Sequence, residues 1–393
     1  MSVVSALPKR VDSPEGLAEA VRDAAGSGAQ VRISGSASMP LTAFNEQRPV
    51  QAISTLRMNK LIEHAVPDMT VIVHAGMTLE ALQKHLAWHN QWLPIDPPAV
   101  NGRNPMQRTL GGIMASNSLG PLRMAFGDWR MLLLGAKWVD ATGTIVKGGG
   151  RTVKNAAGYH TPRLLVGSCG SLGAYCELTL RTYARPVDEQ CVIFFCRDAA
   201  HAEELTAAIL TSPTNPAYIE AIGGATFSRN PLQLPTAGAG TVVLAVGFLD
   251  RPSTCAAQIE TVRALAAAAG TESISQTAAQ AGRLRLWLTS EPASRLAVRM
   301  HGLSSDAAGC VAKFEALAPE AFVVAEAGTG VVRASFKDVD PLALWPKLLE
   351  MLPAHATLVP IQGVTVAPVG AMGLLDRLKK TLDPAGVFGL PPR

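Results

Sequence analysis

Three segments rich in glycine and serine are the residues of this sequence best suited to bind an anion. They cover residues 34–38 (SGSAS), 109–120 and 167–173, and each lies beside a predicted strand. Short side chains let backbone N–H groups converge on an anion and let a ligand approach the main chain. Each segment alone is equally typical of a tight turn. Their order, with residues 153–159 (VKNAAGY) before the third, favours a cradle for a pyrophosphate group.

The common nucleotide and hydrolase signatures are absent. The sequence has no GxxxxGK[ST], no GxGxxG after the first predicted strand, and no HExxH or GxSxG. This argues against a P-loop kinase or ATPase and leaves an N-terminal Rossmann domain unsupported.

Two histidines have the spacing of a metal-binding pair. His85 and His89 stand four residues apart on a predicted helix. No third ligand lies nearby in the sequence, and a site needs more than two ligands. We therefore interpret both as surface histidines and expect no metal site.

Several motifs resemble those of the FAD-binding oxidoreductases of the vanillyl-alcohol oxidase (PCMH) type. Among these, the chain most resembles the FAD-binding subunit of bacterial glycolate oxidase (glycolate dehydrogenase). The motifs are 93–98 (LPIDPP), 109–112 (TLGG), 115–117 (ASN), 120–121 (GP), 153–159 (VKNAAGY), 167–173 (GSCGSLG) and 382–388 (LDPAGVF). Residues 190–345 match only loosely.

The resemblance implies a fold in which two α+β subdomains hold FAD, with the three segments around its pyrophosphate, flavin and ribityl parts. A neutral cradle of N–H donors binds a diphosphate without an arginine cluster. The residues assigned to the cofactor are Ser34, Gly35, Ser36, Ala37, Ser38, Pro97, Thr109, Gly111, Gly112, Ser116, Asn117, Ser118, Gly120, Lys154, Asn155, Gly158, Tyr159, Gly167, Gly170, Gly173 and Tyr175.

Four positions depart from the family pattern. Ile33 replaces a glycine of the first loop, and this loop contains no histidine, so we expect FAD to be held noncovalently. The motif that usually ends in Asp ends in His160, and residues 127–131 (GDWRM) lack the usual acid. Tyr175 stands where a small aliphatic residue is common, and we expect its ring to crowd or stack on the cofactor.

Oxidation of a 2-hydroxy acid, the reaction this resemblance implies, needs a cation for the carboxylate and a base for the hydroxyl proton. Arginine suits the first role and histidine the second. Arg299 and His301 in the expected cap, and His160 beside the flavin-side motif, are the candidate catalytic residues. Isolated charged residues are usually exposed, so surface positions are the alternative for each cap residue, including Arg283, Arg285 and Arg333.

Composition limits the remaining classes. The chain has 393 residues, 48% apolar, with 35 Lys+Arg against 31 Asp+Glu and a net charge of +4. This predicts two or three ordered domains and no nucleic-acid partner, because no run of basic residues exceeds two. Six cysteines without a CxxC predict neither a disulfide framework nor a zinc or iron–sulfur site, and reduced cysteines are typical of the cytoplasm. No signal peptide or membrane-spanning stretch is visible, so any membrane association is expected through a partner.

Apolar periodicity and turn residues predict an α+β protein. We expect helices near 14–26, 78–87, 199–210, 252–269 and 373–382, and strands near 31–33, 69–75, 132–140, 144–147, 174–181, 191–196 and 241–249. The domains expected are 1–186 (PCMH-type FAD binding), 187–345 (cap and substrate) and 346–393 (a C-terminal segment packing back on the first).

Three functions stay open. The first is an FAD oxidoreductase subunit that oxidises a small 2-hydroxy acid such as glycolate or D-lactate and passes electrons to a separate iron–sulfur subunit. The second is the same fold acting on an alcohol, sugar or amine. The third is a flavin-binding structural subunit with little activity of its own.

Overall fold

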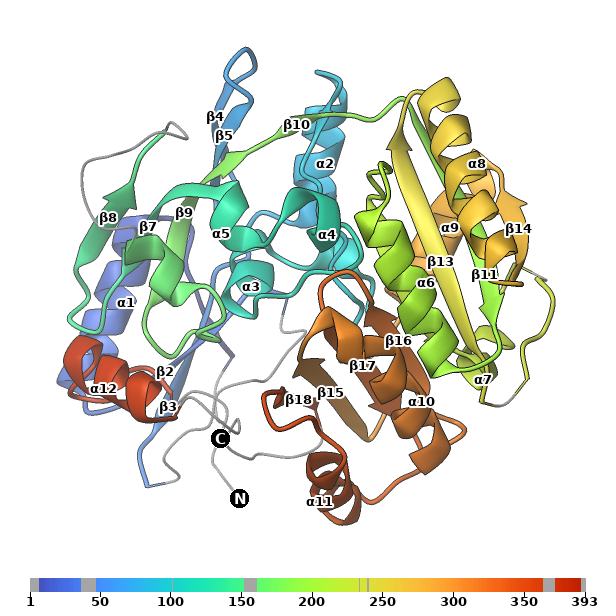
Figure 1. Ribbon diagram of the computed structural model, residues 1–393. Helices are drawn as coiled ribbons and strands as arrows, with labels where there is room; N and C mark the ends of the chain where they lie inside the picture. The colour runs from blue at the N-terminus through green and yellow to red at the C-terminus, as the bar shows by residue number, and fades with distance from the viewer. Residues whose placement is uncertain are drawn as a thin grey trace.

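The computed structural model describes residues 7–36, 47–100, 102–151, 161–232, 234–238, 240–362 and 372–389. The described residues form a three-stranded sheet, a five-stranded sheet and a short two-stranded pair in the first half of the chain, and one eight-stranded sheet in the second half (Figure 1). The expected α+β architecture is confirmed. Among these residues, no helix has the length and apolar character needed to cross a membrane.

The first subdomain is a parallel three-stranded sheet covered by one helix. Ser13 caps α1 (Pro14–Gly26) through a hydrogen bond from the Gly16 N–H, and proline occupies the first turn. The sheet has the order β1-β3-β2, formed by β1 (Lys9–Arg10), β2 (Gln30–Ser34) and β3 (Val50–Ser54). Leu17, Val31 and Ile53 are fully or almost fully buried between helix and sheet.

The second subdomain is a five-stranded antiparallel sheet of order β4-β5-β9-β7-β8. Its strands are β4 (Leu61–Ala65), β5 (Thr70–His74), β7 (Leu133–Val139), β8 (Ile145–Gly149) and β9 (Ala174–Arg181). Helices α2 (Leu79–Ala87), α3 (Leu110–Ala115), α4 (Arg123–Phe126) and α5 (Trp129–Leu132), with 3-10 turns η1 (Pro105–Gln107) and η2 (Thr161–Leu165), connect them. A short pair, β6 (Gln91–Trp92) and β10 (Tyr183–Ala184), precedes the link to the second half.

The second half is an antiparallel sheet of order β14-β11-β13-β12-β16-β17-β15-β18. The strands are β11 (Asp188–Cys196), β12 (Tyr218–Gly223), β13 (Val242–Asp250), β14 (Glu272–Gln276), β15 (Leu296–His301), β16 (Phe322–Glu326), β17 (Val331–Phe336) and β18 (Thr357–Gln362). The helices are α6 (Ala199–Thr211), α7 (Gly224–Phe227), α8 (Pro252–Ala268), α9 (Ala278–Leu288), α10 (Ala307–Leu317) and α11 (Pro341–Glu350), with turn η3 (Ser304–Asp306). We call this half the cap.

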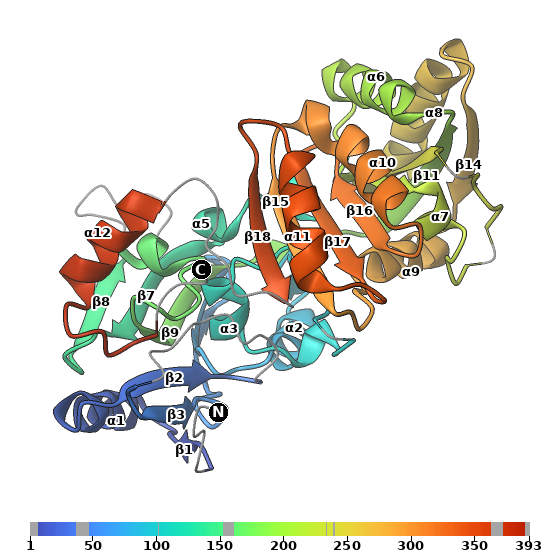
Figure 2. The same cartoon turned by 90° about the horizontal axis from the view of Figure 1, so that it is seen from below.

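Alternation along the cap strands separates two faces of the sheet. On one face, apolar residues pack against α6, α8, α10 and α11. Figure 2 shows α10 and α11 lying over the sheet. On the other face, α7 and α9 cover one part through a second apolar cluster. The same face carries polar residues where it meets the first half of the chain: Glu220, Arg299, His301, Glu326 and Arg333. These five residues are called the cap face below.

The cap sheet continues beyond residue 345, where the sequence analysis ended it. That position lies inside α11, whose Leu344 and Leu348 pack into the cap core, and β18 pairs with β15. The later segment returns to the first subdomain. After α12 (Met372–Leu382), the Val31 N–H donates to the Val387 carbonyl at 2.6 Å, and Phe388 is fully buried.

Candidate functional site

The first glycine/serine segment meets the second at the end of β2. A side chain at Gly35 would overlap Thr109 Oγ1, so only glycine allows this approach. Thr109 in turn caps α3 by accepting a hydrogen bond from the Gly112 N–H. Ser34 and Ser36 therefore lie close to the start of α3, as the sequence analysis requires of a common cradle.

The third segment packs on the other end of α3. The Gly167 N–H donates to the Met114 carbonyl at 3.2 Å, and the Cys169 N–H donates to the Ala115 carbonyl at 2.8 Å. Gly167 and Gly170 have φ values of 78° and 79°, a region that favours glycine. A Cβ at Gly170 would meet nothing within 4 Å, so this turn borders open space.

Asn117 lies where the second and third segments border this open space. Its backbone has a φ of 45°, and its buried Oδ1 has no hydrogen-bond partner among the described residues. A buried polar atom without a partner is costly unless a ligand or water satisfies it. Together with the open turn at Gly170, this fits the polar ribityl and diphosphate chain of FAD.

Several residues assigned to the cofactor also hold the protein's own packing. The N–H groups of Leu110 and Gly111 donate to the Met77 and Ala75 carbonyls, so the start of α3 is docked on the chain after β5. Gly120 lies so close to the Asp96 carbonyl that a Cβ would overlap it. A Cβ at Gly173 would lie 3.0 Å from the Val139 carbonyl oxygen.

Tyr175 is part of the apolar core, whereas Pro97 lines a cleft. The Tyr175 ring belongs to the apolar core of the second subdomain, and its hydroxyl donates to the Pro162 carbonyl at 2.8 Å. The ring thus supports the turn before the third segment. Pro97 is buried and lines a cleft between the 83–106 region and α9, together with Gln83, Met106 and Leu286.

Arg108, which the sequence analysis did not single out, organises the second segment from within. Its guanidinium donates to the Pro98 carbonyl at 3.0 Å, Ser118 Oγ at 2.8 Å and Ser116 Oγ at 3.2 Å. Burial lowers its pKa to about 10, although Glu291 opposes the shift. Its place directly before the capping threonine is the only sequence signal for it.

The cap face reaches the second segment through Arg299. Its guanidinium donates to the Asn117 carbonyl at 2.9 Å and the Ser116 carbonyl at 3.2 Å. Burial lowers the pKa of Arg299 to about 10, and the nearby Arg123 contributes. His301 lies two residues further along β15 on the same face, and burial, with Arg299 and Arg123, lowers its pKa to about 3. His301 is therefore neutral at physiological pH.

The charged residues of this interface are mostly paired and buried. Arg123 lies 3.4 Å from Glu326, and Arg333 lies 3.5 Å from Glu291. Burial, with repulsion from Glu326, raises the pKa of Glu220 well above its ordinary value. The surface alternative for Arg299 and Arg333 is thus wrong, because the cap sheet turns them inward.

On α9, the Arg285 side chain is largely buried and the Arg283 side chain is exposed. Arg285 bridges Asp96 at 3.2 Å and Glu189 at 2.8 Å, so its surface interpretation is also wrong. Burial raises the pKa of Asp96 to about 6, although Arg285 opposes the shift. Arg283 is exposed, as expected.

The C-terminal segment is hydrogen-bonded to the third glycine/serine segment. Lys379 Nζ donates to the carbonyls of Ser171 at 2.7 Å and Phe388 at 2.9 Å, and it pairs with the fully buried Asp383 carboxylate. Asp383 also accepts the Val387 and Phe388 N–H groups. The motif at 382–388 was expected from the sequence, whereas Lys379 was not.

Part of the expected site lies outside the described residues. These positions are Ala37, Ser38, Lys154, Asn155, Gly158, Tyr159 and His160. Their assignments stay predictions.

Comparison with known proteins identifies the cofactor of this region. Residues 8–149 match the family described as FAD binding domain. The chain is 30% identical to glycolate oxidase subunit GlcE of Escherichia coli (strain K12) over 141 residues, 35% of this chain and 39% of that protein. It is 33% identical to the mitochondrial D-lactate dehydrogenase [cytochrome] of Arabidopsis thaliana over 147 residues, 37% of this chain and 24% of that protein.

The chain thus spans at most about two-fifths of these relatives' length. Among solved structures, an alkyldihydroxyacetonephosphate synthase matches with a TM-score of 0.69 at 18% identity, covering 98% of this chain and 75% of that one. This likeness shows the fold alone. The family match confirms the expected cofactor, FAD.

Proposed function

Residues 8–149 belong to the FAD binding domain family, and from this premise we propose that the protein is an FAD-dependent oxidoreductase subunit acting on a small 2-hydroxy acid such as glycolate or D-lactate. Bound FAD supplies a hydride acceptor at flavin N5. The chain's own residues then have to bind the carboxylate, orient the hydroxyl-bearing carbon and hold its proton.

One observation supports the proposal: Arg299 of the cap face contacts the second glycine/serine segment, and His301 lies two residues further along β15 on the same face. Arg299 contacts the Ser116 and Asn117 carbonyls, while its buried Nε has no hydrogen-bond partner among the described residues. Arg123 adds a second positive charge near His301. An unsatisfied buried guanidinium nitrogen in a positive field suits a carboxylate.

His301 suits the role of base for the hydroxyl proton. Its imidazole is neutral because burial and the two arginines oppose its protonation. A carboxylate bound beside these arginines offsets their field and raises the His301 pKa. Its basicity therefore increases when the substrate is bound.

Electron transfer out of the protein requires a partner under this proposal. All six cysteines are free thiols, and the sequence has no CxxC that could hold an iron–sulfur cluster. One relative is itself named as a subunit of glycolate oxidase. We propose a separate iron–sulfur subunit as the acceptor.

The test is anaerobic addition of glycolate or D-lactate to the purified FAD-loaded protein while the flavin absorbance is followed. We expect the flavin bands to bleach, and His301→Gln to slow bleaching by about 10²–10⁴-fold, the usual contribution of a general base. Arg283→Gln, on the exposed side of α9, is the matched control and should bleach at the parent rate.

Bands that persist with every 2-hydroxy acid, with and without the iron–sulfur partner, would overturn the substrate assignment. Bleaching by an alcohol, sugar or amine instead would establish a different substrate class. A parent rate in His301→Gln would remove this residue from the mechanism.

A further inference from the structure

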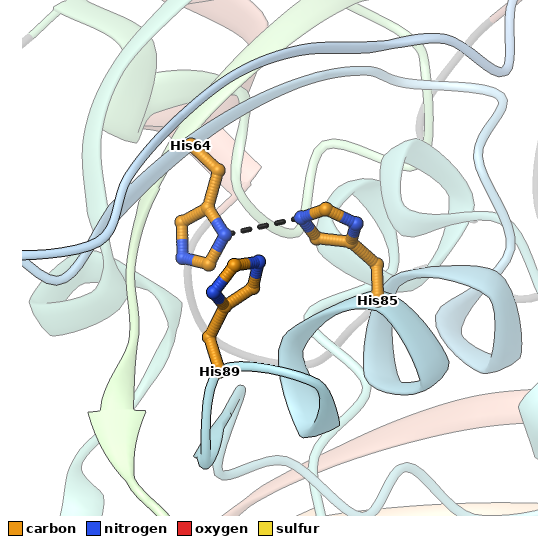
Figure 3. Close-up of side chains that lie close together, drawn as sticks. All are labelled: His64, His85 and His89. Carbon is orange, nitrogen blue, oxygen red and sulfur yellow. Dashed lines mark hydrogen bonds between the residues drawn. The ribbon is translucent and has the colours of Figure 1, made fainter.

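Three histidines from two distant segments meet on the surface of the second subdomain. His85 lies in the last turn of α2, and His89 follows the end of this helix. The third, His64, comes from β4, at the edge of the sheet. Figure 3 shows their imidazole rings turned toward one another, with centroids 4.9 to 5.4 Å apart.

The ring nitrogens have the spacing of a coordination sphere. One nitrogen of each histidine lies within 4.8 Å of those of the other two. His64 Nδ1 and His85 Nε2 are 3.1 Å apart. Nitrogens bound at about 2.0–2.1 Å to a tetrahedral ion are separated by roughly 3.3 Å. His89 is exposed, so its side chain can complete the set by a small rotation.

A buried amide orients the first of these ligands. His64 Nε2 lies 3.1 Å from Gln91 Oε1, and the Gln91 amide N–H donates to the Val66 carbonyl at 2.8 Å. Thr182 donates its hydroxyl to the same Gln91 oxygen. Gln91 Oε1 is thereby fixed as an acceptor, so the His64 proton resides on Nε2 and the Nδ1 lone pair faces His85. Metal-bound histidines are commonly oriented in this way by a second hydrogen bond.

The charges around the cluster favour a cation of one chemical class. The nearest acid in the sequence, Glu63, is paired with Arg151 at 2.9 Å. Three imidazoles without a carboxylate suit Zn²⁺, Cu²⁺ or Ni²⁺ rather than Mg²⁺ or Ca²⁺.

We propose that His64, His85 and His89 bind one divalent transition-metal ion of the Zn²⁺ class, with its remaining coordination position open to solvent. The ion joins the edge strand β4 to the end of α2. Gln91, which belongs to β6, carries this link to β10 and so to the connection between the FAD binding domain and the cap. The proposal is independent of the substrate assigned above.

The test is calorimetric titration of Zn²⁺ into the FAD-loaded protein, prepared without an affinity tag and treated with a chelator that is then removed. We expect one equivalent to bind and to raise the melting temperature, because a ligand that binds only the folded state stabilises it. His89→Ala should weaken binding by at least about tenfold, and His64→Ala should do the same.

His355→Ala is the matched control, because His355 is also a partly exposed histidine but lies in the cap beside Asp306. It should bind Zn²⁺ like the parent. The flavin spectrum should be unchanged in all four proteins, which separates this result from any failure of the flavin site. Absence of saturable Zn²⁺ binding, or equal affinity in the parent and His89→Ala, would overturn the proposal.

Discussion

The glycine/serine segments and the cap face border the same region, but they are built in opposite ways. The segments are neutral and hold their shape by close backbone approach, as at Gly35 against Thr109. The cap face is charged and holds its shape by pairs across strands and domains, such as Arg123 with Glu326. The first suits a long polar cofactor, and the second suits a small charged substrate.

This difference implies that the two regions tolerate substitutions differently. A neutral cradle depends on backbone geometry, which a single added Cβ can disturb. A buried charge depends on its partner, and the loss of one partner leaves the other charge uncompensated. Residues 8–149, which include the first two segments, match a known family. Under the proposed function, exchange of paired residues on the cap face would change the substrate.

The third neutral segment is also supported by a buried cation from outside it, because Lys379 donates a hydrogen bond to the Ser171 carbonyl. Lys379→Met leaves the fully buried Asp383 without its counterion. We expect a loss of about 3–5 kcal/mol in the free energy of unfolding. Chemical denaturation measures this loss, and weaker FAD retention should accompany it because the third segment loses an anchor.

Lys380→Met is the matched control, since the neighbouring lysine is exposed. It should change the free energy of unfolding by less than about 0.5 kcal/mol. Equal stability of the two variants would show that the segments do not rely on this buried charge.

Substitution of Gly120 tests the close approach of the second glycine/serine segment to the backbone of Asp96 and to the cap. In Gly120→Ala the new Cβ overlaps the Asp96 carbonyl and lies 3.1 Å from Thr289 Cγ2 in the cap. We expect a loss of about 1–3 kcal/mol, typical of overpacking. Gly26→Ala, where a Cβ meets nothing within 4 Å, should be neutral or stabilising. Thermal melts of both variants measure these changes in stability. An unchanged melting temperature in Gly120→Ala would contradict the expected loss and would mean that the backbone moves to accommodate the new Cβ.

At neutral pH the smallest expected effect is that of His301, whose contribution to stability changes only as the pH falls below about 6.5. Its folded pKa of about 3 lies below the ordinary value of 6.5, so only the unfolded chain binds this proton between the two values. Stability should therefore fall as the pH is lowered from 6.5 toward 3. In His301→Gln this part of the slope should flatten. Denaturant midpoints of the parent and the variant measured against pH test it, and parallel slopes in the two proteins would contradict it.

Local signals in the sequence were sufficient for five of the twelve α-helices and seven of the eighteen strands of the described residues. Ser13 and Thr78 cap α1 and α2, which lie within the predicted ranges 14–26 and 78–87, and the strand predicted at 174–181 is β9. The strands β3 and β4 were not predicted, and neither were six of the eight strands of the cap sheet, because short strands without flanking turn signals leave little local pattern. The missed β4 carries His64, and this is why the pair of His85 and His89 looked incomplete.

The residues of the candidate site were likewise predicted only in part from the sequence. The glycine/serine segments were predicted as parts of one site because glycine reports a local backbone requirement. Arg108, Arg285 and Arg333 were missed or placed on the surface, because a buried arginine has no local signature. Its burial depends on which strands become neighbours and which carboxylate they bring to it.

The sequence by itself determined part of the helices and strands, the α+β class and the resemblance to FAD-binding proteins, since capping, periodicity and glycine positions act over a few residues. Only the tertiary structure decided that Arg299 reaches Ser116 and Asn117, that Lys379 holds Ser171, and that His64 completes a histidine triad. Each of these contacts joins residues that are distant in the chain. Their free energy depends on burial and on partners that are adjacent only after the sheets have formed.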